Sequence, residues 1–154
     1  MANVYDVLVE RGFIYQVTDE AALRAALESP LTLYCGYDLT APSLQVGNLA
    51  TMMMLVHMQQ HGHRVIVLVG GGTTLIGDPS GRTAARPILS PEVIAAYQES
   101  IRRQLSQFLD FGGGRALMLN NAAWLTRLNY IEFLRDIGRH FSVNEMLAAE
   151  AYRQ

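Results

Sequence analysis

The hydrophobic positions follow two different patterns along the chain. Between Gly47 and about His61, apolar residues recur at i, i+3, i+4 and i+7 starting from Leu49, which is typical of one buried helix face. The run RVIVLV at Arg64–Val69 is instead apolar almost without a break, as in a parallel strand that is covered on both sides. Because the two patterns adjoin, the sequence predicts a helix that leads directly into a buried strand.

Similar signals predict the other elements. Short apolar runs predict strands at Leu31–Cys35 and Ala116–Leu119. Helical spacing and capping residues predict further helices at Asn3–Arg11, Thr18–Glu28 with Thr18 as N-cap, Ser90–Leu109, Tyr130–Arg139 and Ser142–Tyr152. Strands that alternate with helices in this way predict an α/β fold with a parallel sheet and right-handed crossovers.

Glycine and polar residues follow each predicted strand. The first is followed by Gly36-Tyr37-Asp38, the second by the glycine-rich stretch Gly70–Gly81, expected to be a loop, and the third by Asn120-Asn121. In open parallel sheets, ligands bind beyond the carboxyl ends of the strands. The sequence therefore predicts a binding site at this edge of the sheet.

Two familiar nucleotide-binding loops do not fit this edge. A Walker A loop needs Gly-Lys-Ser/Thr after its first glycine and four residues, whereas Gly77 is followed here by Asp78, whose carboxylate would repel a polyphosphate. A G-x-G-x-x-G sequence after the first strand is also missing. The helix that begins near Gly47 instead offers unpaired N–H groups suited to phosphate. Because Gly47 has no side chain, an adenine base could stack on the backbone there. Asp78 could pair with a substrate ammonium, or it could simply form a turn.

Three blocks, found in this order, carry a resemblance to a known family. They are YCGYDLTAPSLQVGNL at Tyr34–Leu49, VGGGTTLIGDPSGR at Val69–Arg82, and YIEFLRDIGRHFSVN at Tyr130–Asn144. Together they resemble the class I aminoacyl-tRNA synthetases, and specifically the bacterial tyrosyl-tRNA synthetases. The resemblance implies a Rossmann-like parallel sheet with flanking helices. It also implies a homodimer contact around Tyr130–Leu147, where two predicted amphipathic helices carry more apolar surface than a small layer needs.

The resemblance implies a tyrosine site. Tyr34 would hydrogen-bond the substrate phenol, and Asp78 together with Thr73 would receive the substrate ammonium. Gly36 and Asp38 would line the site of tyrosyl-adenylate.

The resemblance also implies an ATP site. Thr40 and Gln45 would meet the polyphosphate, and with Asn48 they are the expected catalytic residues. The residues expected to contact ATP are Asp38, Thr40, Gln45, Gly47, Asn48 and Thr51. Arg82 and Arg86 could touch phosphate or tRNA, although a solvated loop is the better explanation of both.

The implied reaction joins tyrosine to ATP as tyrosyl-adenylate, and then transfers the tyrosyl group to tRNA(Tyr). ATP is a substrate, Mg²⁺ is expected to accompany it, and no tightly bound metal with protein ligands is expected. No protein nucleophile is needed, because the substrate carboxylate attacks the α-phosphate. Catalysis would then consist of positioning and of hydrogen bonds to developing phosphate charge.

The sequence departs from the family pattern in several places. Gln45 stands where the family usually has histidine, and an amide can donate to phosphate without carrying a positive charge. Leu39 stands where proline is usual, and Ala122-Ala123 lacks the aspartate often found before the tryptophan. Residues 1–154 are expected to be the N-terminal portion of the catalytic domain, without its C-terminal half, the lysine-bearing ATP motif and the anticodon-binding domain. The alternative is a non-catalytic fragment or minimal derivative of the same fold that binds nucleotide or tyrosyl-adenylate.

Composition narrows the function classes further. All twelve basic residues are arginine, so no lysine of this chain can act as a Schiff base or a P-loop residue. The net charge of −2 argues against a stand-alone nucleic-acid binder. The single cysteine, Cys35, and the lack of a signal peptide or long apolar run favour a cytoplasmic protein that does not enter a membrane. His57, His61 and His63 could suggest a zinc site, but without a third well-placed ligand a solvated helix end is the better explanation.

Overall fold

A computed structural model describes residues 3–77 and 89–148 of the chain. The chain divides into two compact units, Met1–Ala122 and Ala123–Gln154, which are considered separately. The strands are β1 Thr32–Tyr37, β2 Arg64–Val69 and β3 Ala116–Asn120. The α-helices are α1 Val4–Glu10, α2 Glu20–Ala26, α3 Leu49–Gln60, α4 Gly71–Ile76, α5 Pro91–Leu105, α6 Ala122–Leu125, α7 Tyr130–Asp136 and α8 Val143–Ala148. Short 3₁₀ turns are η1 Val46–Asn48, η2 Gly112–Gly114 and η3 Gly138–His140.

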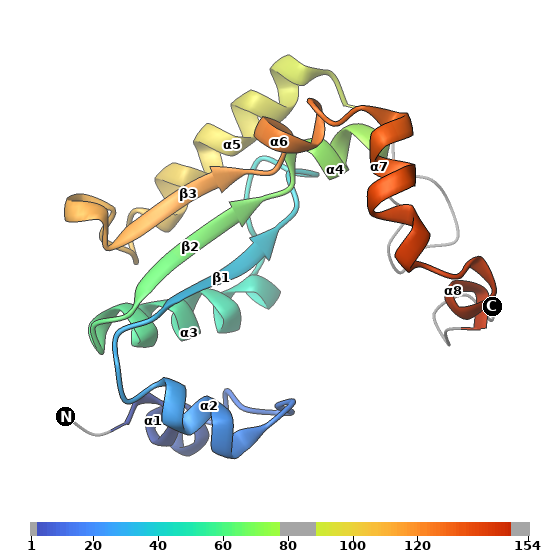
Figure 1. Ribbon diagram of the computed structural model, residues 1–154. Coiled ribbons are helices and arrows are strands. Elements are labelled where there is room, and N and C mark those ends of the chain that lie inside the picture. The colour runs from blue at the N-terminus through green and yellow to red at the C-terminus, as the bar shows by residue number, and fades with distance from the viewer. Residues whose placement is uncertain (1–2, 78–88, 149–154) are drawn as a thin grey trace. The chain divides into compact units, whose positions relative to one another are not determined.

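A parallel three-stranded sheet forms the centre of the first unit (Figure 1). The strand order is β1-β2-β3, with Tyr37 opposite Val69 and Val69 opposite Asn120. Helix α3 connects β1 to β2, and α5 lies on the connection from β2 to β3. The predicted α/β class and the β-α-β-α-β order are therefore confirmed, and β2 has the predicted bounds.

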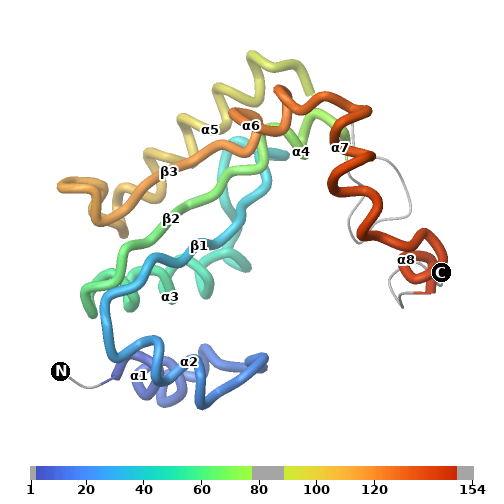
Figure 2. Tube along the Cα trace, viewed as in Figure 1, coloured from blue at the N-terminus to red at the C-terminus, as the bar shows by residue number. Residues whose placement is uncertain are grey.

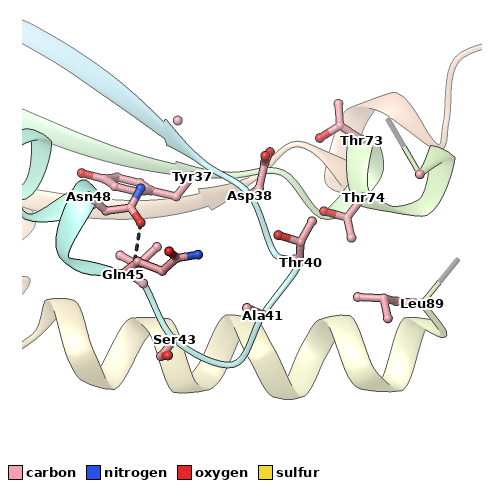
Figure 3. A pocket seen from close by; sticks show the side chains of 13 residues that line it. Tyr37, Asp38, Thr40, Ala41, Ser43, Gln45, Asn48, Thr73, Thr74 and Leu89 are labelled. Atoms are coloured by element: carbon pink, nitrogen blue, oxygen red, sulfur yellow. Dashed lines mark hydrogen bonds between the residues drawn. The ribbon is translucent and has the colours of Figure 1, made fainter. Parts of the chain in front are cut away.

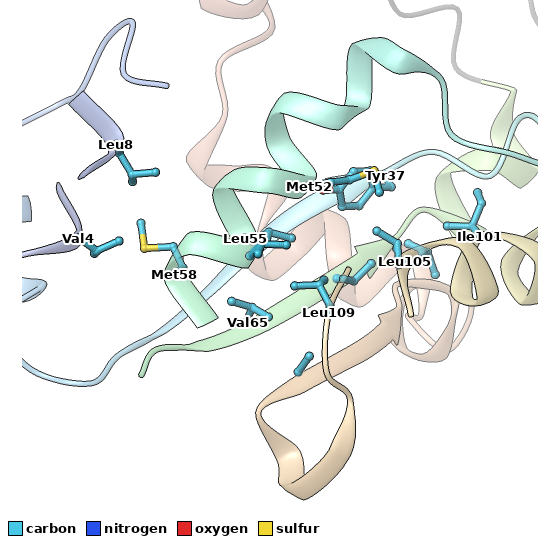
Figure 4. Packing of buried hydrophobic residues seen from close by; sticks show 14 of the residues in the cluster. Val4, Leu8, Tyr37, Met52, Leu55, Met58, Val65, Ile101, Leu105 and Leu109 are labelled. Carbon is cyan, nitrogen blue, oxygen red and sulfur yellow. The ribbon is translucent and has the colours of Figure 1, made fainter. Parts of the chain in front are cut away.

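The main hydrophobic core lies on one face of this sheet. Val65, Val67 and Val69 of β2 are all 0% exposed, because α3 and α5 cover the face to which these alternate residues point. Leu55 of α3 and Leu105 of α5 belong to the same core cluster as Val65 (Figure 4). The sequence predicts cover on both faces of β2, yet Ile66 and Leu68 on the other face are only half-buried.

The glycine-rich stretch after β2 is partly helical, so the prediction of a loop is wrong at this point. Helix α4 begins immediately after Gly70 and ends at Gly77, whose φ of 75° is left-handed and suits glycine. The amide N–H of Gly72 donates to the side-chain Oδ1 of Asn121 at 2.7 Å. An amide from the end of β3 therefore satisfies one of the donors that a helix start leaves unpaired.

Two helix starts differ from their predicted form. The N-cap of α2 is Asp19 rather than Thr18, because the Asp19 carboxylate accepts from the amide of Ala22 at 2.9 Å. The helix predicted from Gly47 opens with the 3₁₀ turn η1 and becomes α-helical at Leu49. Ser90 caps α5 as predicted, and this cap hydrogen-bonds the Glu92 side chain and lowers its carboxyl pKa.

Helix α1 packs against α3 with Val4, Tyr5 and Leu8 buried in the same core (Figure 2). The Arg24 guanidinium of α2 lies 4.7 Å from the centre of the Tyr5 ring and forms an ion pair with Asp6. These contacts join the two N-terminal helices to each other, while apolar burial joins α1 to the sheet layer.

Two histidines are buried where α3 ends and the chain turns into β2. The His57 ring meets Phe13 edge-on, with 5.5 Å between ring centres, and His63 Nδ1 accepts from the amide of Leu31 at 3.3 Å. Burial lowers the pKa of both imidazoles, and the charge of Arg11 lowers that of His57 further. In the described residues, no group of three or more His, Cys, Asp or Glu could hold a metal ion.

The second unit is described from Ala123 to Ala148. It contains α7, η3 and α8, and Asn129 caps α7 by accepting from the amides of Ile131 and Glu132. No residue described in this unit is buried. Across both units, none of the described helices has the length and apolar character needed to cross a bilayer.

Candidate active site

A cavity of about 630 Å³ lies at the carboxyl ends of β1 and β2, where the sequence predicts a binding site (Figure 3). Its walls come from the end of β1, the loop that leads to α3, helix α4 and the start of the connection to α5. The described lining residues are Gly36, Tyr37, Asp38, Thr40, Ala41, Ser43, Leu44, Gln45, Asn48, Thr73, Thr74, Gly77 and Leu89.

The cavity brings together six of the residues that the resemblance assigns to the site. They are Gly36, Asp38, Thr40, Gln45, Asn48 and Thr73. They come from two segments separated by more than twenty residues, which the parallel register of β1 and β2 places side by side. Their individual roles remain predictions.

Three other predicted site residues are not among the described lining residues. Tyr34 is 69% exposed and lies on the face of β1 opposite to the buried Tyr37. Gly47 lies in the turn η1 and Thr51 in the first turn of α3, and the hydroxyl of Thr51 donates to the carbonyl oxygen of Asn48 at 2.8 Å. Asp78 lies outside the described residues, as do Arg82 and Arg86.

Asn48 is fixed where the loop turns into α3. Its side-chain Oδ1 accepts from the backbone amide of Gln45 at 3.1 Å, which closes the η1 turn. In the described part of the chain, no group accepts from the Asn48 amide nitrogen. That nitrogen is a donor at the cavity wall, beside the unpaired N–H groups of a helix start.

The side chain of Asn121 fixes the position of α4, the helix that forms the cavity wall opposite Asn48. In addition to its bond with Gly72, its Nδ2 donates to the Thr73 hydroxyl at 3.4 Å. Thr73 in turn donates to the carbonyl of Gly70 at 3.1 Å. A Cβ atom on Gly71 would lie 2.3 Å from Oδ1 of Asn120, so any other residue at this position would have to displace the Asn120 side chain.

Two buried hydroxyls at this cavity were not singled out from the sequence. The Tyr37 and Thr74 side chains have no hydrogen-bond partner in the described structure that meets ordinary geometry. Burial raises the pKa of the Tyr37 phenol, although the nearby Thr51 hydroxyl lowers it in part. The alternation of β1 and its register with Val69 could have identified Tyr37 as inward-facing, whereas Thr74 depends on α4, which the sequence did not predict.

Neutral donors and acceptors dominate the described lining. Asp38 carries the one carboxylate, and no arginine or histidine is present among the described lining residues. Hydroxyls and amides of this kind can hydrogen-bond a phosphate, a ribose or an amino acid without fixed positive charge. The described lining residues therefore offer a polyphosphate hydrogen bonds and no cationic contact.

Comparison with known proteins agrees with this architecture. Residues 26–154 match the family of class I tRNA synthetases for tryptophan and tyrosine. The chain is 61% identical over 153 residues to the tyrosine–tRNA ligase of Syntrophus aciditrophicus, covering 99% of this chain and 36% of that protein. It is 59% identical over 152 residues to the tyrosine–tRNA ligase of Desulfosudis oleivorans, covering 98% of this chain and 35% of that protein. The chain thus spans just over a third of the length of these relatives.

Solved structures give the same result for the fold. A C-terminally truncated mitochondrial tyrosyl-tRNA synthetase from Aspergillus nidulans superimposes with a TM-score of 0.84 and 29% identity, covering 99% of this chain and 46% of that chain. The corresponding Coccidioides posadasii protein gives a TM-score of 0.79 and 26% identity, with 99% and 44% coverage. The chain therefore belongs to the class I tRNA synthetases of the tryptophan and tyrosine group, and it corresponds to the N-terminal part of the tyrosine–tRNA ligases.

Proposed function

We propose that this chain binds L-tyrosine and ATP and supports formation of tyrosyl-adenylate, the first half of tyrosine–tRNA ligation. The observation that carries the proposal is the cavity at the ends of β1 and β2, which gathers six residues assigned to this chemistry by the resemblance. The relatives at 59–61% identity are named tyrosine–tRNA ligases, which supports tyrosine as one of the substrates.

The two walls of the cavity suit the two substrates. On the α4 wall, the Thr73 hydroxyl lies near Gly36 and Asp38 and would receive the tyrosine ammonium together with Asp78. On the opposite wall, Thr40, Gln45 and Asn48 present a hydroxyl and two amides to the phosphates and the ribose. Gly47 and Thr51 would contact the adenosine at the start of α3, and Tyr34 the substrate phenol.

In the proposed reaction, a carboxylate oxygen of tyrosine attacks the α-phosphorus of ATP. A bond forms between that oxygen and phosphorus, the bond from the α-phosphorus to the bridging oxygen breaks, and pyrophosphate leaves. Thr40 and Gln45 would donate hydrogen bonds to the oxygens that gain charge. Mg²⁺ would enter with ATP and neutralise part of the polyphosphate charge.

Transfer to tRNA(Tyr) follows in the proposal, as the names of the relatives indicate, and a cytoplasmic location is proposed with it.

We also propose that the apolar residues of Tyr130–Leu147 form a contact between two copies of the chain. Ile131, Phe141 and Leu147 are each more than 60% exposed, which is unusual for large apolar side chains grouped in one short segment. Sedimentation at micromolar concentration would show a dimer, and a strictly monomeric species would contradict the contact.

A second candidate is a binding module without catalysis. It is favoured by the amide of Gln45 in place of a cationic group and by the neutral character of the described lining. Tyrosine-dependent exchange of pyrophosphate into ATP separates the two candidates. Exchange by the wild-type chain supports the enzyme, whereas binding of tyrosine and ATP without exchange supports the module.

Two variants refine this experiment. Thr40→Ala removes a hydroxyl expected to bond a charged phosphate oxygen, so exchange should fall about tenfold to a hundredfold. Thr18→Ala removes an exposed hydroxyl near α2 and serves as the control, with exchange unchanged. Equal exchange by Thr40→Ala and wild type would remove Thr40 from the proposed machinery.

A further inference from the structure

A side chain from α5 pairs with the backbone of the loop that forms one wall of the cavity. Gln104 Oε1 accepts from the amide N–H of Leu44 at 2.9 Å, and Gln104 Nε2 donates to the carbonyl oxygen of Leu44 at 3.2 Å. The carboxamide therefore satisfies both backbone groups of one residue, as a neighbouring strand would. The two residues are 60 positions apart in the sequence.

This pairing occurs where the loop has little other support. Positions 39–43 lie outside the helices and strands. Within the described residues, their backbone groups make no hydrogen bond to another backbone group. Side-chain packing holds the two ends of the segment, since Leu39 is 0% exposed and Leu44 packs against the core. At the Leu44 end, the pairing with Gln104 also lets α5 fix the course of the backbone.

The paired residue lies between groups that face the cavity. Ser43 and Gln45 flank Leu44 and all three line the cavity, whereas Gln104 is not among the described lining residues. The carbonyl of Gln45 accepts from the amide of Asn48 at 2.9 Å, so the position of Leu44 is transmitted directly to the start of η1. A shift of the Leu44 backbone would therefore displace Gln45 and Asn48 together.

We propose that Gln104 is a positioning residue, which holds the Thr40–Asn48 loop in the conformation that binds ATP. The proposal rests on the proposed function for its ligand. Its geometric part, the pairing of Gln104 with Leu44, stands independently of that function. Gln104 acts through the loop and touches no reacting atom.

Two substitutions at Gln104 change the two hydrogen bonds to Leu44 in different ways. Gln104→Met keeps the length of the side chain and removes both hydrogen bonds. Gln104→Glu keeps an acceptor for the Leu44 amide but places a carboxylate oxygen against the Leu44 carbonyl. Gln107→Met makes the same chemical change at an exposed position just beyond the end of α5 and is the matched control.

Four measurements on the purified chain read out the effect. They are amide hydrogen exchange at Leu44, affinity for α,β-methylene ATP, affinity for L-tyrosine, and thermal unfolding. In Gln104→Met we expect faster exchange at Leu44 and about tenfold weaker binding of the nucleotide, because the loop must be ordered on binding. Tyrosine affinity should change less than twofold, since Gly36 and Thr73 are held by β1 and α4. Gln104→Glu should weaken nucleotide binding at least as much as Gln104→Met, because its carboxylate oxygen and the Leu44 carbonyl oxygen repel each other.

The outcomes distinguish this proposal from its alternatives. Unchanged nucleotide affinity in Gln104→Met, despite faster exchange at Leu44, would overturn the positioning role. An equal loss of both ligands with a lower melting temperature would also overturn it, by showing general destabilisation. A wild-type chain that binds L-tyrosine but not α,β-methylene ATP would overturn the proposed function, and faster exchange at Leu44 in Gln104→Met would still uphold the pairing.

Discussion

The two units of the chain place similar apolar patterns in different environments. In the first unit, Leu55 of α3 and Val67 of β2 are 0% exposed, because helices and sheet cover one another. In the second unit, Ile131 and Leu134 of α7 are 67% and 45% exposed although they also recur at helical spacing. The difference shows that hydrophobic spacing predicts a helix and its apolar face without identifying what covers that face.

Leu55→Ala should have the largest effect on folding. The substitution removes a fully buried side chain between α3 and the sheet, so the free energy of unfolding should fall by about 2–5 kcal/mol. Ile131→Ala in the second unit should change it by about 0.5 kcal/mol or less in the monomer, as for an exposed position. Urea denaturation measures both, and equal losses would refute the contrast between the units.

Gly71→Ala should have the next largest effect. The added Cβ would overlap the Asn120 side chain at 2.3 Å, and displacing either group should cost about 1–3 kcal/mol. The matched change in the second unit, Gly138→Ala, places its Cβ at an ordinary 3.4 Å from Leu134 Cδ2 and should be tolerated. Denaturation midpoints of the two variants test this, and a tolerated Gly71→Ala would mean that Asn120 is free to move.

Asp19→Ala should have a smaller effect. It removes the carboxylate that caps α2 through the Ala22 amide, which should cost about 1 kcal/mol. Asn129→Ala removes the equivalent cap of α7, where no buried core reinforces the helix. Circular dichroism during urea unfolding compares the two, and we expect Asn129→Ala to lose helix locally and Asp19→Ala to shift the main transition. A coincident shift in both would argue against independent units.

The pH dependence of the free energy of unfolding should be the smallest of these effects near neutral pH. Burial lowers the pKa of His57 and His63 below the unfolded value near 6.5, so both imidazoles fold in the neutral form. The unfolded chain then binds more protons as pH falls below about 6.5, and stability is lost in that range while it is fully present above it. His57→Gln and His63→Gln should flatten this dependence, whereas His140→Gln, at an exposed site in the second unit, should not. If the slope of unfolding free energy against pH were unchanged in all three variants, His57 and His63 would not be the source of this dependence.

Elements stabilised by residues nearby in the sequence could be predicted, and those that depend on distant residues could not. Strand β2 was predicted with its observed bounds because RVIVLV is apolar at consecutive positions and is bounded by Gly62-His63 and Gly70. Helix α4 was missed because glycine has low helix propensity and its support comes from Asn121, 49 residues away in the sequence. Local patterns therefore predicted the elements with local causes.

The candidate site shows the same limit. Parallel topology was enough to predict that Gly36-Tyr37-Asp38 and the glycine-rich stretch after β2 would meet at one edge, and the cavity is found there. Thr40 and Thr73, which also line it, were expected from the resemblance. The inward-facing hydroxyl of Thr74 depends on the helical twist of α4, and the Gln104 pairing depends on where α5 passes the loop. Neither the orientation of Thr74 nor the pairing of Gln104 can be predicted from the residues that adjoin it in the sequence.

The burial of Tyr37 has a consequence for the charge state of the cavity. Since desolvation raises the pKa of its phenol above the ordinary value, the Tyr37 hydroxyl remains protonated at neutral pH. The floor of the cavity therefore adds no phenolate to the charge of Asp38. Because the Tyr37 hydroxyl is itself buried, the fixed negative charge among the described lining residues is that of Asp38 alone.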